Sequence, residues 1–322
     1  MKAIQVNQTG GPEVLELVEL PLPQPKSNAA VVQIAASGVN YVDAYMRSGA
    51  YKAPLPFIAG QEGAGVITAV GHEVKFLKAG DRVAWSGVLG SYAEYVAAPA
   101  EALVPVPAGV SDRDAAATML QGMTAHYLCN DTYPLKPGET ALIQAASGGV
   151  GLLLVQMAHH LGARVIGAVS SEEKAKLARE AGADEVIFYT QTDFEAEAKR
   201  LTGGRGVDVV YDSVGKDTFD KSMNVLRPRG MLVLYGASSG PVPPVDPQVL
   251  AQKGSIYMAR TSIAHFTATR PELLARSGAV FSMIAEGKLK RRIGRAYPLA
   301  EVQQAHRDLE TRKTAGKLLL IP

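Results

Sequence analysis

The segment Ala141-Leu142-Ile143-Gln144-Ala145-Ala146-Ser147-Gly148-Gly149-Val150-Gly151, ALIQAASGGVG, joins a short apolar run to a stretch of small residues. The residues that follow it, LLLVQMAHHLG, place apolar side chains at helical spacing. A turn with almost no side chains lets another group approach the backbone closely. We interpret residues 145–151 as the first strand-to-helix turn of a doubly wound sheet, where the helix N-terminus attracts a pyrophosphate.

The motif in this turn is A-x-x-G-x-x-G, whereas the usual dinucleotide-binding pattern is G-x-G-x-x-G. Small-residue turns of this kind also allow a helix to pack closely on a strand. The surrounding chain favours binding, because six apolar strands alternate with helical segments. These strands are TALIQA, ARVIGAV, EVIFY, VDVVYDSV, MLVLYG and SIYMAR. The alternation predicts an α/β fold with a six-strand parallel sheet, doubly wound as in the Rossmann fold, and helices on both faces.

The end of the second strand indicates which dinucleotide fits. NAD sites usually place Asp or Glu there to bind the ribose 2′-hydroxyl. This strand ends in Ser170-Ser171, with Lys174 one turn later. Hydroxyls and an ammonium would bind a 2′-phosphate, which a carboxylate would repel, so we expect NADP(H). Glu172 and Glu173 leave the choice open, since either carboxylate could turn toward the site.

Several helices have recognisable boundaries. Ser111 is a candidate N-cap for a helix that continues past Cys129, and Ser171 is a candidate N-cap for a helix that stops at Gly182. We also predict a helix over 217–230, DTFDKSMNVLRPRG.

The first 110 or so residues have a different texture. Short alternating or apolar runs are separated by Gly and Pro signals such as TGGP, PLPQP and KAPLP, which predicts a compact barrel or sandwich. The pattern changes again after Arg270. A helix, a strand, a second helix and the strand KLLLIP follow, and they do not continue the strand–helix alternation of the doubly wound sheet. These pieces could return to the first domain.

Composition excludes several classes of protein. The chain has 322 residues, 47% of them apolar, and a net charge of +2, too mild to indicate binding to nucleic acid. We expect no membrane span, because no run approaches the roughly 18 apolar residues that one needs. Cys129 is the only cysteine, so no intramolecular disulfide can form. Together with an N-terminus that lacks a signal-peptide pattern, this predicts a cytoplasmic protein.

Motifs along almost the whole chain resemble one protein family. They are GGPEVLEL, GVNYVDAYMRSGAY (38–51), GQEGAGVI (60–67), KAGDRV (78–83), AASGGVG, VDVVYDSVGKDTFDKSM, YGASSG (235–240) and TAGKLLLIP. The sequence resembles the medium-chain dehydrogenase/reductase superfamily, in its zinc-independent NADPH:quinone oxidoreductase branch, which is similar to zeta-crystallin. This resemblance implies a GroES-like, β-rich catalytic domain over 1–120, a Rossmann NADP(H)-binding domain over 121–264, and a segment over 265–322 that rejoins the first. It places the active site in the cleft between domains.

The resemblance also shows a departure from the zinc-dependent relatives. Those enzymes have a Cys ligand in the segment matching GVNYVD and a His ligand in the segment matching GQEG, where this chain has Asn40 and Gln61. The histidines show no metal-ligand spacing apart from the adjacent pair His159 and His160, and adjacent helical residues point about 100° apart. We therefore predict no metal site.

The resemblance assigns candidate residues one position at a time. Asn40, Tyr45 and Tyr51 would be catalytic and lie around the nicotinamide, with Asn40 and Tyr51 on the substrate side. Ser147, Gly148, Gly149, Val150 and Gly151 would bind the pyrophosphate, and Ser170, Lys174 and Tyr189 the 2′-phosphate region. The remaining cofactor contacts would be Asn40, Tyr45, Thr124, Ser213, Tyr235, Ser238 and Arg312.

These assignments predict NADPH-dependent reduction of quinones by hydride transfer without a metal. An alternative is NADPH-dependent reduction of activated alkenes (enals, enones or enoyl thioesters) with Tyr51 as proton donor. A further alternative is a non-enzymatic NADPH-binding redox sensor, although a sensor would not need Asn40, Tyr45 and Tyr51. Relatives in this branch are commonly homodimers that pair sheet edges, so we expect a homodimer formed through SIYMAR.

Overall fold

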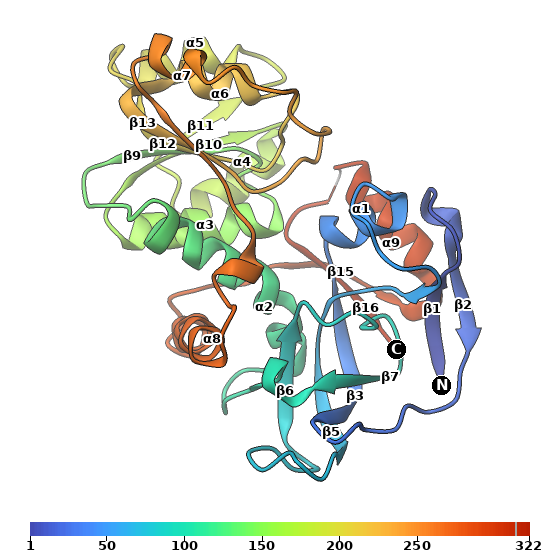
Figure 1. Ribbon diagram of the computed structural model, residues 1–322. Helices are drawn as coiled ribbons and strands as arrows, with labels where there is room; N and C mark the ends of the chain where they lie inside the picture. The colour runs from blue at the N-terminus through green and yellow to red at the C-terminus, as the bar shows by residue number, and fades with distance from the viewer. Residues whose placement is uncertain (313) are drawn as a thin grey trace. The chain divides into compact units, whose positions relative to one another are not determined.

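The computed structural model describes residues 1–312 and 314–322 (Figure 1). The chain divides into two compact units. Unit 1 contains Met1–Met123 and Thr267–Pro322, and unit 2 contains Thr124–Phe266. Each unit has its own sheets and core.

Unit 2 is built on a six-stranded parallel sheet with the strand order β11-β10-β9-β12-β13-β14. The strands are β9 (Thr140–Ile143), β10 (Arg164–Val169), β11 (Glu185–Phe188), β12 (Val207–Asp212), β13 (Leu226–Leu234) and β14 (Tyr257–Arg260). The order reverses between β9 and β12, which is the topological switch point of a doubly wound sheet. The predicted α/β fold with a six-strand parallel sheet is confirmed.

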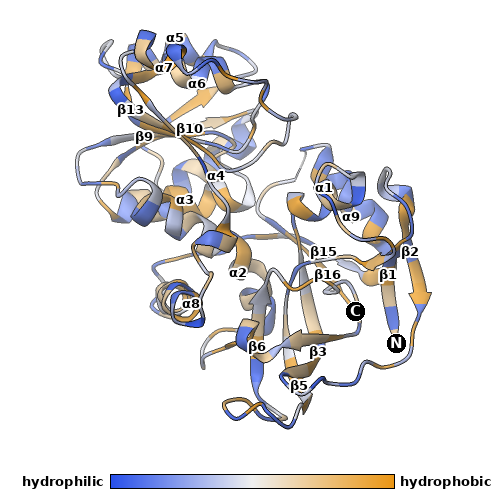
Figure 2. Cartoon of the chain, viewed as in Figure 1, coloured by the Kyte–Doolittle hydropathy of each residue, from blue (hydrophilic) through white to orange (hydrophobic). Residues whose placement is uncertain are grey.

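Helices cover both faces of this sheet (Figure 1). They are α3 (Gly149–His160), α4 (Glu172–Glu180), α5 (Phe194–Leu201), α6 (Phe219–Asn224) and α7 (Gln248–Gln252). Helices α3 and α4 lie on one face, and α5 to α7 on the other. The strands between them are mainly apolar (Figure 2), and every residue of β9 and β12 is buried. Burial on two faces explains why these strands read as continuous apolar runs.

Unit 1 is β-rich. Its larger sheet has the strand order β15-β16-β3-β5-β6-β8, with β7 also paired to β3, and its smaller sheet the order β2-β1-β4. The strands are β1 (Lys2–Val6), β2 (Leu15–Glu19), β3 (Ala29–Val39), β4 (Phe57–Ile58), β5 (Glu62–Val70), β6 (Arg82–Ser86), β7 (Tyr95–Pro99), β8 (Val104–Pro105), β15 (Ile293–Pro298) and β16 (Lys317–Ile321). Because β16 pairs antiparallel with β3, the last strand of the chain completes a sheet that the N-terminal segment begins.

The helices of unit 1 are α1 (Tyr41–Ser48), α8 (Arg270–Ala285), α9 (Val302–Glu310) and the part of α2 (Asp112–Tyr127) up to Met123. Two predicted N-caps are present, since Ser111 Oγ accepts the Asp114 N–H at 3.1 Å and Ser171 Oγ accepts the Lys174 N–H at 3.4 Å. Cys129 is buried in a π-helix, Leu128–Thr132, that continues α2. Helix α1 was not predicted.

The prediction of a helix over 217–230 is wrong in its second half. Helix α6 ends at Asn224, and β13 begins at Leu226. Pro228 has no N–H and cannot continue a helix, and it disfavours helical backbone at the residue before it. Arg229 then adopts a positive φ of 61° within an irregular stretch of β13.

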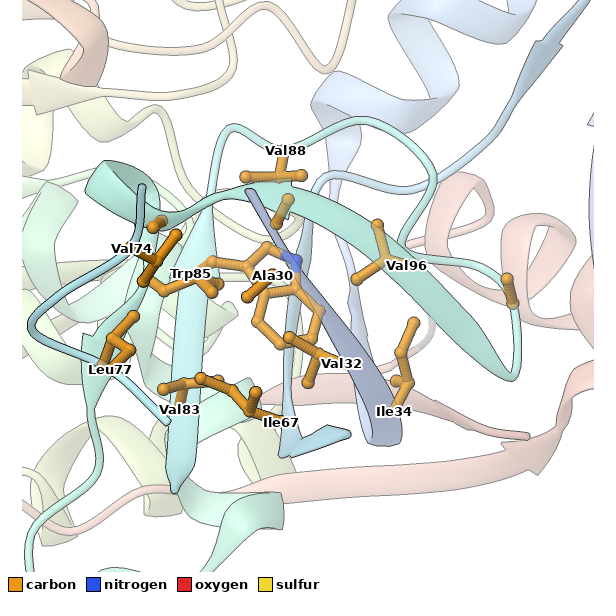
Figure 3. Packing of buried hydrophobic residues seen from close by; sticks show 14 of the residues in the cluster. Ala30, Val32, Ile34, Ile67, Val74, Leu77, Val83, Trp85, Val88 and Val96 are labelled. Carbon is orange, nitrogen blue, oxygen red and sulfur yellow. The ribbon is translucent and has the colours of Figure 1, made fainter. Parts of the chain in front are cut away.

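Trp85 lies at the centre of one core of unit 1 (Figure 3). It is completely buried among apolar residues that include Val32, Ile67 and Val83. Its indole N–H donates to Ser91 Oγ at 2.8 Å, so the polar atom of this ring is also satisfied.

Replacing Trp85 with Ala should lower the free energy of unfolding by about 3–5 kcal/mol, because it leaves a cavity in a closely packed core. Trp85→Phe keeps most of the volume and should cost clearly less. Urea denaturation followed by circular dichroism measures both, since Trp85 is the only tryptophan and its fluorescence is lost. A loss below about 1 kcal/mol in Trp85→Ala would contradict this account of the core.

Candidate active site

The small-residue turn joins β9 to α3 in unit 2. Ala145 has a positive φ of 52°, and α3 begins at Gly149. A Cβ on Gly151 would collide with the Ala145 carbonyl oxygen and approach the Ala146 carbonyl carbon to 2.9 Å. Gly151 therefore allows the helix to pack on the turn. The first N–H groups of a helix have no intrahelical acceptor, so those at the start of α3 can bind an anion.

Three predicted residues gather where β10 and β11 end. Ser170 directly follows β10, and its carbonyl accepts the Thr190 hydroxyl at 3.0 Å. Tyr189 directly follows β11, with 46% of its side chain exposed. Lys174 lies on the first turn of α4, where partial burial lowers the pKa of its amine and Glu173 acts in the opposite direction. Glu172 pairs with Arg179 at 2.7 Å, and both side chains of this ion pair are exposed.

A second group lies where β12 and β13 end. The Ser238 N–H donates to the Ser213 carbonyl at 3.1 Å, and the Ser213 side chain hydrogen-bonds to Tyr235. Burial raises the pKa of the Tyr235 hydroxyl well above its usual value. These contacts bring Ser213, Tyr235 and Ser238 together, whereas Thr124 is buried on α2.

In unit 1, helix α1 and the segment after it hold three tyrosines. The ring centroids of Tyr41 and Tyr45 are 6.0 Å apart, and those of Tyr45 and Tyr51 are 5.2 Å apart. Tyr51 is 43% exposed, so this aromatic pair reaches the surface of the unit. Arg312 hydrogen-bonds to the Tyr41 hydroxyl, which places it beside this cluster.

Asn40 precedes α1, and only 4% of it is exposed. Its Nδ2 donates to the Gly38 carbonyl at 3.2 Å and to Glu62 Oε2 at 2.8 Å. Its Oδ1 accepts from Lys317 Nζ at 2.7 Å and from Gln121 Nε2 at 3.4 Å. Asn40 therefore caps the helix that carries Tyr45, and its amide points into the protein interior.

A buried polar chain continues from the N-terminus of α1. Asp43 Oδ2 accepts from the Asn40 N–H at 2.9 Å and from the Tyr92 hydroxyl at 2.8 Å, while Asp43 Oδ1 has no partner among the described residues. Burial raises the pKa of Asp43 to about 7. His306 lies 3.4 Å from the Tyr92 hydroxyl and 3.2 Å from Arg47, and burial, helped by that guanidinium, lowers its pKa to about 3. Arg47 pairs with Glu310 at 2.6 Å.

Sequence reasoning missed Glu62, Lys317, Asp43, Gln121 and His306. A signal exists for two of them, because Glu62 stands in a Gly-rich apolar strand and Lys317 begins the apolar run KLLLIP. A single charge within an apolar strand indicates a buried, paired group.

Gln61, at the position where zinc-dependent relatives have His, donates to Met46 Sδ at 2.8 Å. Over the described ranges 1–312 and 314–322, no three His, Cys, Asp or Glu side chains gather as a metal site would require. Nor does any helix in these ranges have the length and apolar character to cross a membrane.

Known proteins similar to this chain share both units. The alcohol dehydrogenase GroES-like domain family matches residues 26–108, and the zinc-binding dehydrogenase family matches residues 149–276. The chain is 45% identical over 323 residues to the quinone oxidoreductase of Pseudomonas aeruginosa, covering 100% of this chain and 99% of the relative. The chain belongs to the quinone oxidoreductase family of the medium-chain dehydrogenases/reductases.

Two further members of the superfamily are informative. The crystal structure of Escherichia coli quinone oxidoreductase complexed with NADPH superposes with a TM-score of 0.98 at 44% identity, covering 100% of both chains. A 2-haloacrylate reductase from Burkholderia is 39% identical over 329 residues, covering 99% of this chain and 98% of the relative. The family is therefore established over the whole chain, and its members carry more than one reductase name.

Replacing Asp43 with Asn should change how stability depends on pH. The folded pKa of Asp43, about 7, lies above its ordinary 3.8, so its contribution is full at low pH and is lost as pH rises from about 4 to 7. The folded pKa of His306, about 3, lies below its ordinary 6.5, so its contribution is lost as pH falls from 6.5 toward 3. These two slopes oppose each other between about pH 4 and 6.5.

In the Asp43→Asn variant only His306, of these two residues, still contributes to the change of stability with pH. Its free energy of unfolding, from urea denaturation at several pH values, should rise by roughly 3 kcal/mol more than that of the wild type between pH 4 and 6.5. The exposed Asp220→Asn is the control and should follow the wild type. Identical profiles for all three proteins would show that Asp43 is not the buried titrating group.

Proposed function

We propose that this protein is an NADPH-dependent quinone oxidoreductase that transfers a hydride to its acceptor without a metal. The observation that carries this proposal is the 45% identity, over the whole chain, to a quinone oxidoreductase. The geometry of the two units supports it separately on the cofactor side and on the acceptor side.

The residues of unit 2 fit NADPH. The first N–H groups of α3 have no intrahelical acceptor and are suited to a pyrophosphate, and Gly151 lets α3 pack against the turn because a Cβ there would collide with the Ala145 carbonyl. Ser170 follows β10, the Lys174 amine lies on the first turn of α4, and Glu172 pairs with Arg179 on the surface of the same helix. We assign Ser147 to Gly151 to the pyrophosphate, Ser170, Lys174 and Tyr189 to the 2′-phosphate region, and Ser213, Tyr235 and Ser238 to the other end of the cofactor. Thr124 and Arg312 remain assignments from the family.

When bound, NADPH supplies the hydride. Reduction of a quinone builds negative charge on the acceptor oxygen, and the protein can stabilise that charge with preorganised donors. The hydroxyls of Tyr45 and Tyr51 are suitable donors, since a phenol carries an O–H group. Asn40 would orient this region from the N-terminus of α1, because its amide is already fully hydrogen-bonded inside the unit.

A second candidate function is the NADPH-dependent reduction of activated alkenes. The 39% identity to a 2-haloacrylate reductase favours it specifically. This reaction needs a proton delivered to carbon, and the exposed Tyr51 would provide it.

We also propose a homodimer formed through β14, in a cytoplasmic protein. Strand β14 is the last strand of its sheet, and Tyr257 and Met258 on it are 55% and 38% exposed. An apolar edge strand of this kind invites pairing with a second copy. The buried single cysteine is compatible with a reducing compartment.

The purified, chelator-treated protein should oxidise NADPH rapidly with benzoquinones and naphthoquinones, and NADH only slowly. Crotonyl-CoA and simple enones tested beside them distinguish the second function, because turnover of alkenes alone would make Tyr51 a proton donor and the protein an alkene reductase. Tight NADPH binding without turnover of any acceptor would overturn both enzymatic proposals and favour a redox sensor.

Lys174→Met should weaken NADPH binding about 10- to 100-fold and leave NADH binding almost unchanged, because only NADPH carries the 2′-phosphate. Fluorescence titration of each cofactor measures the two dissociation constants. Lys176→Met is the matched control, since Lys176 lies on the same helix, is exposed and faces Glu180 at 4.0 Å. An equal effect of Lys174→Met on both cofactors would contradict the assignment.

A further inference from the structure

Glu62 is a carboxylate with no exposed surface, at the first residue of β5. Its Oε1 accepts the Leu120 N–H of α2 at 2.6 Å. Its Oε2 accepts from Asn40 Nδ2 at 2.8 Å and pairs with Lys317 Nζ of β16. This one side chain therefore connects β5, α2, the start of α1 and the last strand of the chain.

The Asn40 amide uses its whole hydrogen-bonding capacity in this cluster. A side-chain amide has two N–H donors and two acceptor positions on oxygen. Glu62 and the Gly38 carbonyl take both donors, and Lys317 and Gln121 take both acceptor positions. Because Lys317 can only donate and ionised Glu62 can only accept, these two residues determine which way the amide faces.

The cluster of Glu62, Asn40 and Lys317 is closely packed around Gly38. A Cβ on Gly38 would collide with Glu62 Oε2, and it would lie 2.7 Å from Lys317 Cε and 2.8 Å from the Ala116 carbonyl oxygen. Lys317 is 2% exposed, so no bulk water compensates its charge or that of Glu62. Removal of either charge would leave the other buried without a partner, which is strongly unfavourable.

We propose that Lys317 is a positioning residue of the acceptor side of this enzyme. Its amine neutralises Glu62, fixes the orientation of the Asn40 amide, and through Asn40 holds the Gln121 side chain of α2. The turnover part of this inference rests on the proposed function, whereas the stability part does not.

The experiment is a cycle of Lys317→Met, Glu62→Gln and the double variant, with the exposed Lys75→Met as control. Each single variant should lower the Tm by on the order of 10 °C, because it leaves one buried charge alone. The double variant removes both charges and should recover most of that loss. It also remains available if a single variant does not fold.

The kcat of the double variant distinguishes a positioning role of Lys317 from a role in charge compensation alone. In the double variant the Asn40 amide has lost the donor that orients it, so kcat with quinones should stay about 100-fold below the wild type while the dissociation constant for NADPH is unchanged. Recovery of wild-type kcat together with the Tm would overturn the positioning role. An unchanged Tm in Lys317→Met would overturn the inference as a whole.

A pH series gives a third readout. In Lys317→Met a buried charge has lost its partner, whereas the double variant carries neither charge, so the Tm of Lys317→Met should fall with rising pH more steeply than that of the double variant. Asp43 and Tyr92 also face Glu62 electrostatically, and the Glu62 charge raises the pKa of both, so the comparison is made with Asp43→Asn present in each variant. Parallel pH curves would contradict the inference. A wild type that reduces no quinone would contradict only the proposed function, and the Tm cycle and pH series would then decide the inference.

Discussion

The burial of Glu62 is the constraint on which the structure of unit 1 depends. A carboxylate without exposed surface requires a counter-charge and donors for both oxygens. The backbone of α2 and the Asn40 amide provide donors, and Lys317, 255 residues away in sequence, provides the charge. Since Lys317 begins β16, the ion pair forms only when the last strand has paired with β3. The polar cluster and the sheet therefore complete each other.

A second group of buried polar residues begins at Asp43 on α1, and its side chains are mainly neutral. Asp43 hydrogen-bonds to Tyr92, and Tyr92 lies next to His306. Within the part of the chain that the structure describes, neither Asp43 nor His306 forms an ion pair, whereas the neighbouring Arg47 pairs with Glu310. Burial therefore favours the neutral forms of Asp43 and His306, and their pKa values move toward each other and cross. The opposed slopes reduce the dependence of stability on pH over the range in which both groups are neutral in the folded protein. The neutral side chains of Asp43 and His306 thus lie near the cluster that contains the Glu62–Lys317 ion pair.

Local sequence patterns predicted the strands of unit 2 but not the buried contacts inside unit 1. The strands of the parallel sheet are continuous apolar runs, and the Ser171 cap of α4 depends on a residue three positions away. The helix predicted over 217–230 failed at Pro228, where a local rule was overlooked. The pairing of Glu62 with Lys317 is different in kind, because no local pattern relates two residues on strands from opposite ends of the chain. Asn40 was identified as important from the family, but only the contacts of its amide show that it is oriented by buried neighbours.

The turn after β9 shows that packing and binding can require the same small residues. Gly151 is needed because a Cβ would meet the Ala145 carbonyl, and that need exists with or without a ligand. The closeness of helix and turn that it allows also brings the first N–H groups of α3 to the surface where a pyrophosphate can reach them. The sequence left open the direction of two acidic side chains at the start of α4, Glu172 and Glu173. Glu172 pairs with Arg179, two turns along α4, in a solvent-exposed ion pair. The proposed role of Lys174 in binding the 2′-phosphate therefore also depends on where these two carboxylates are held.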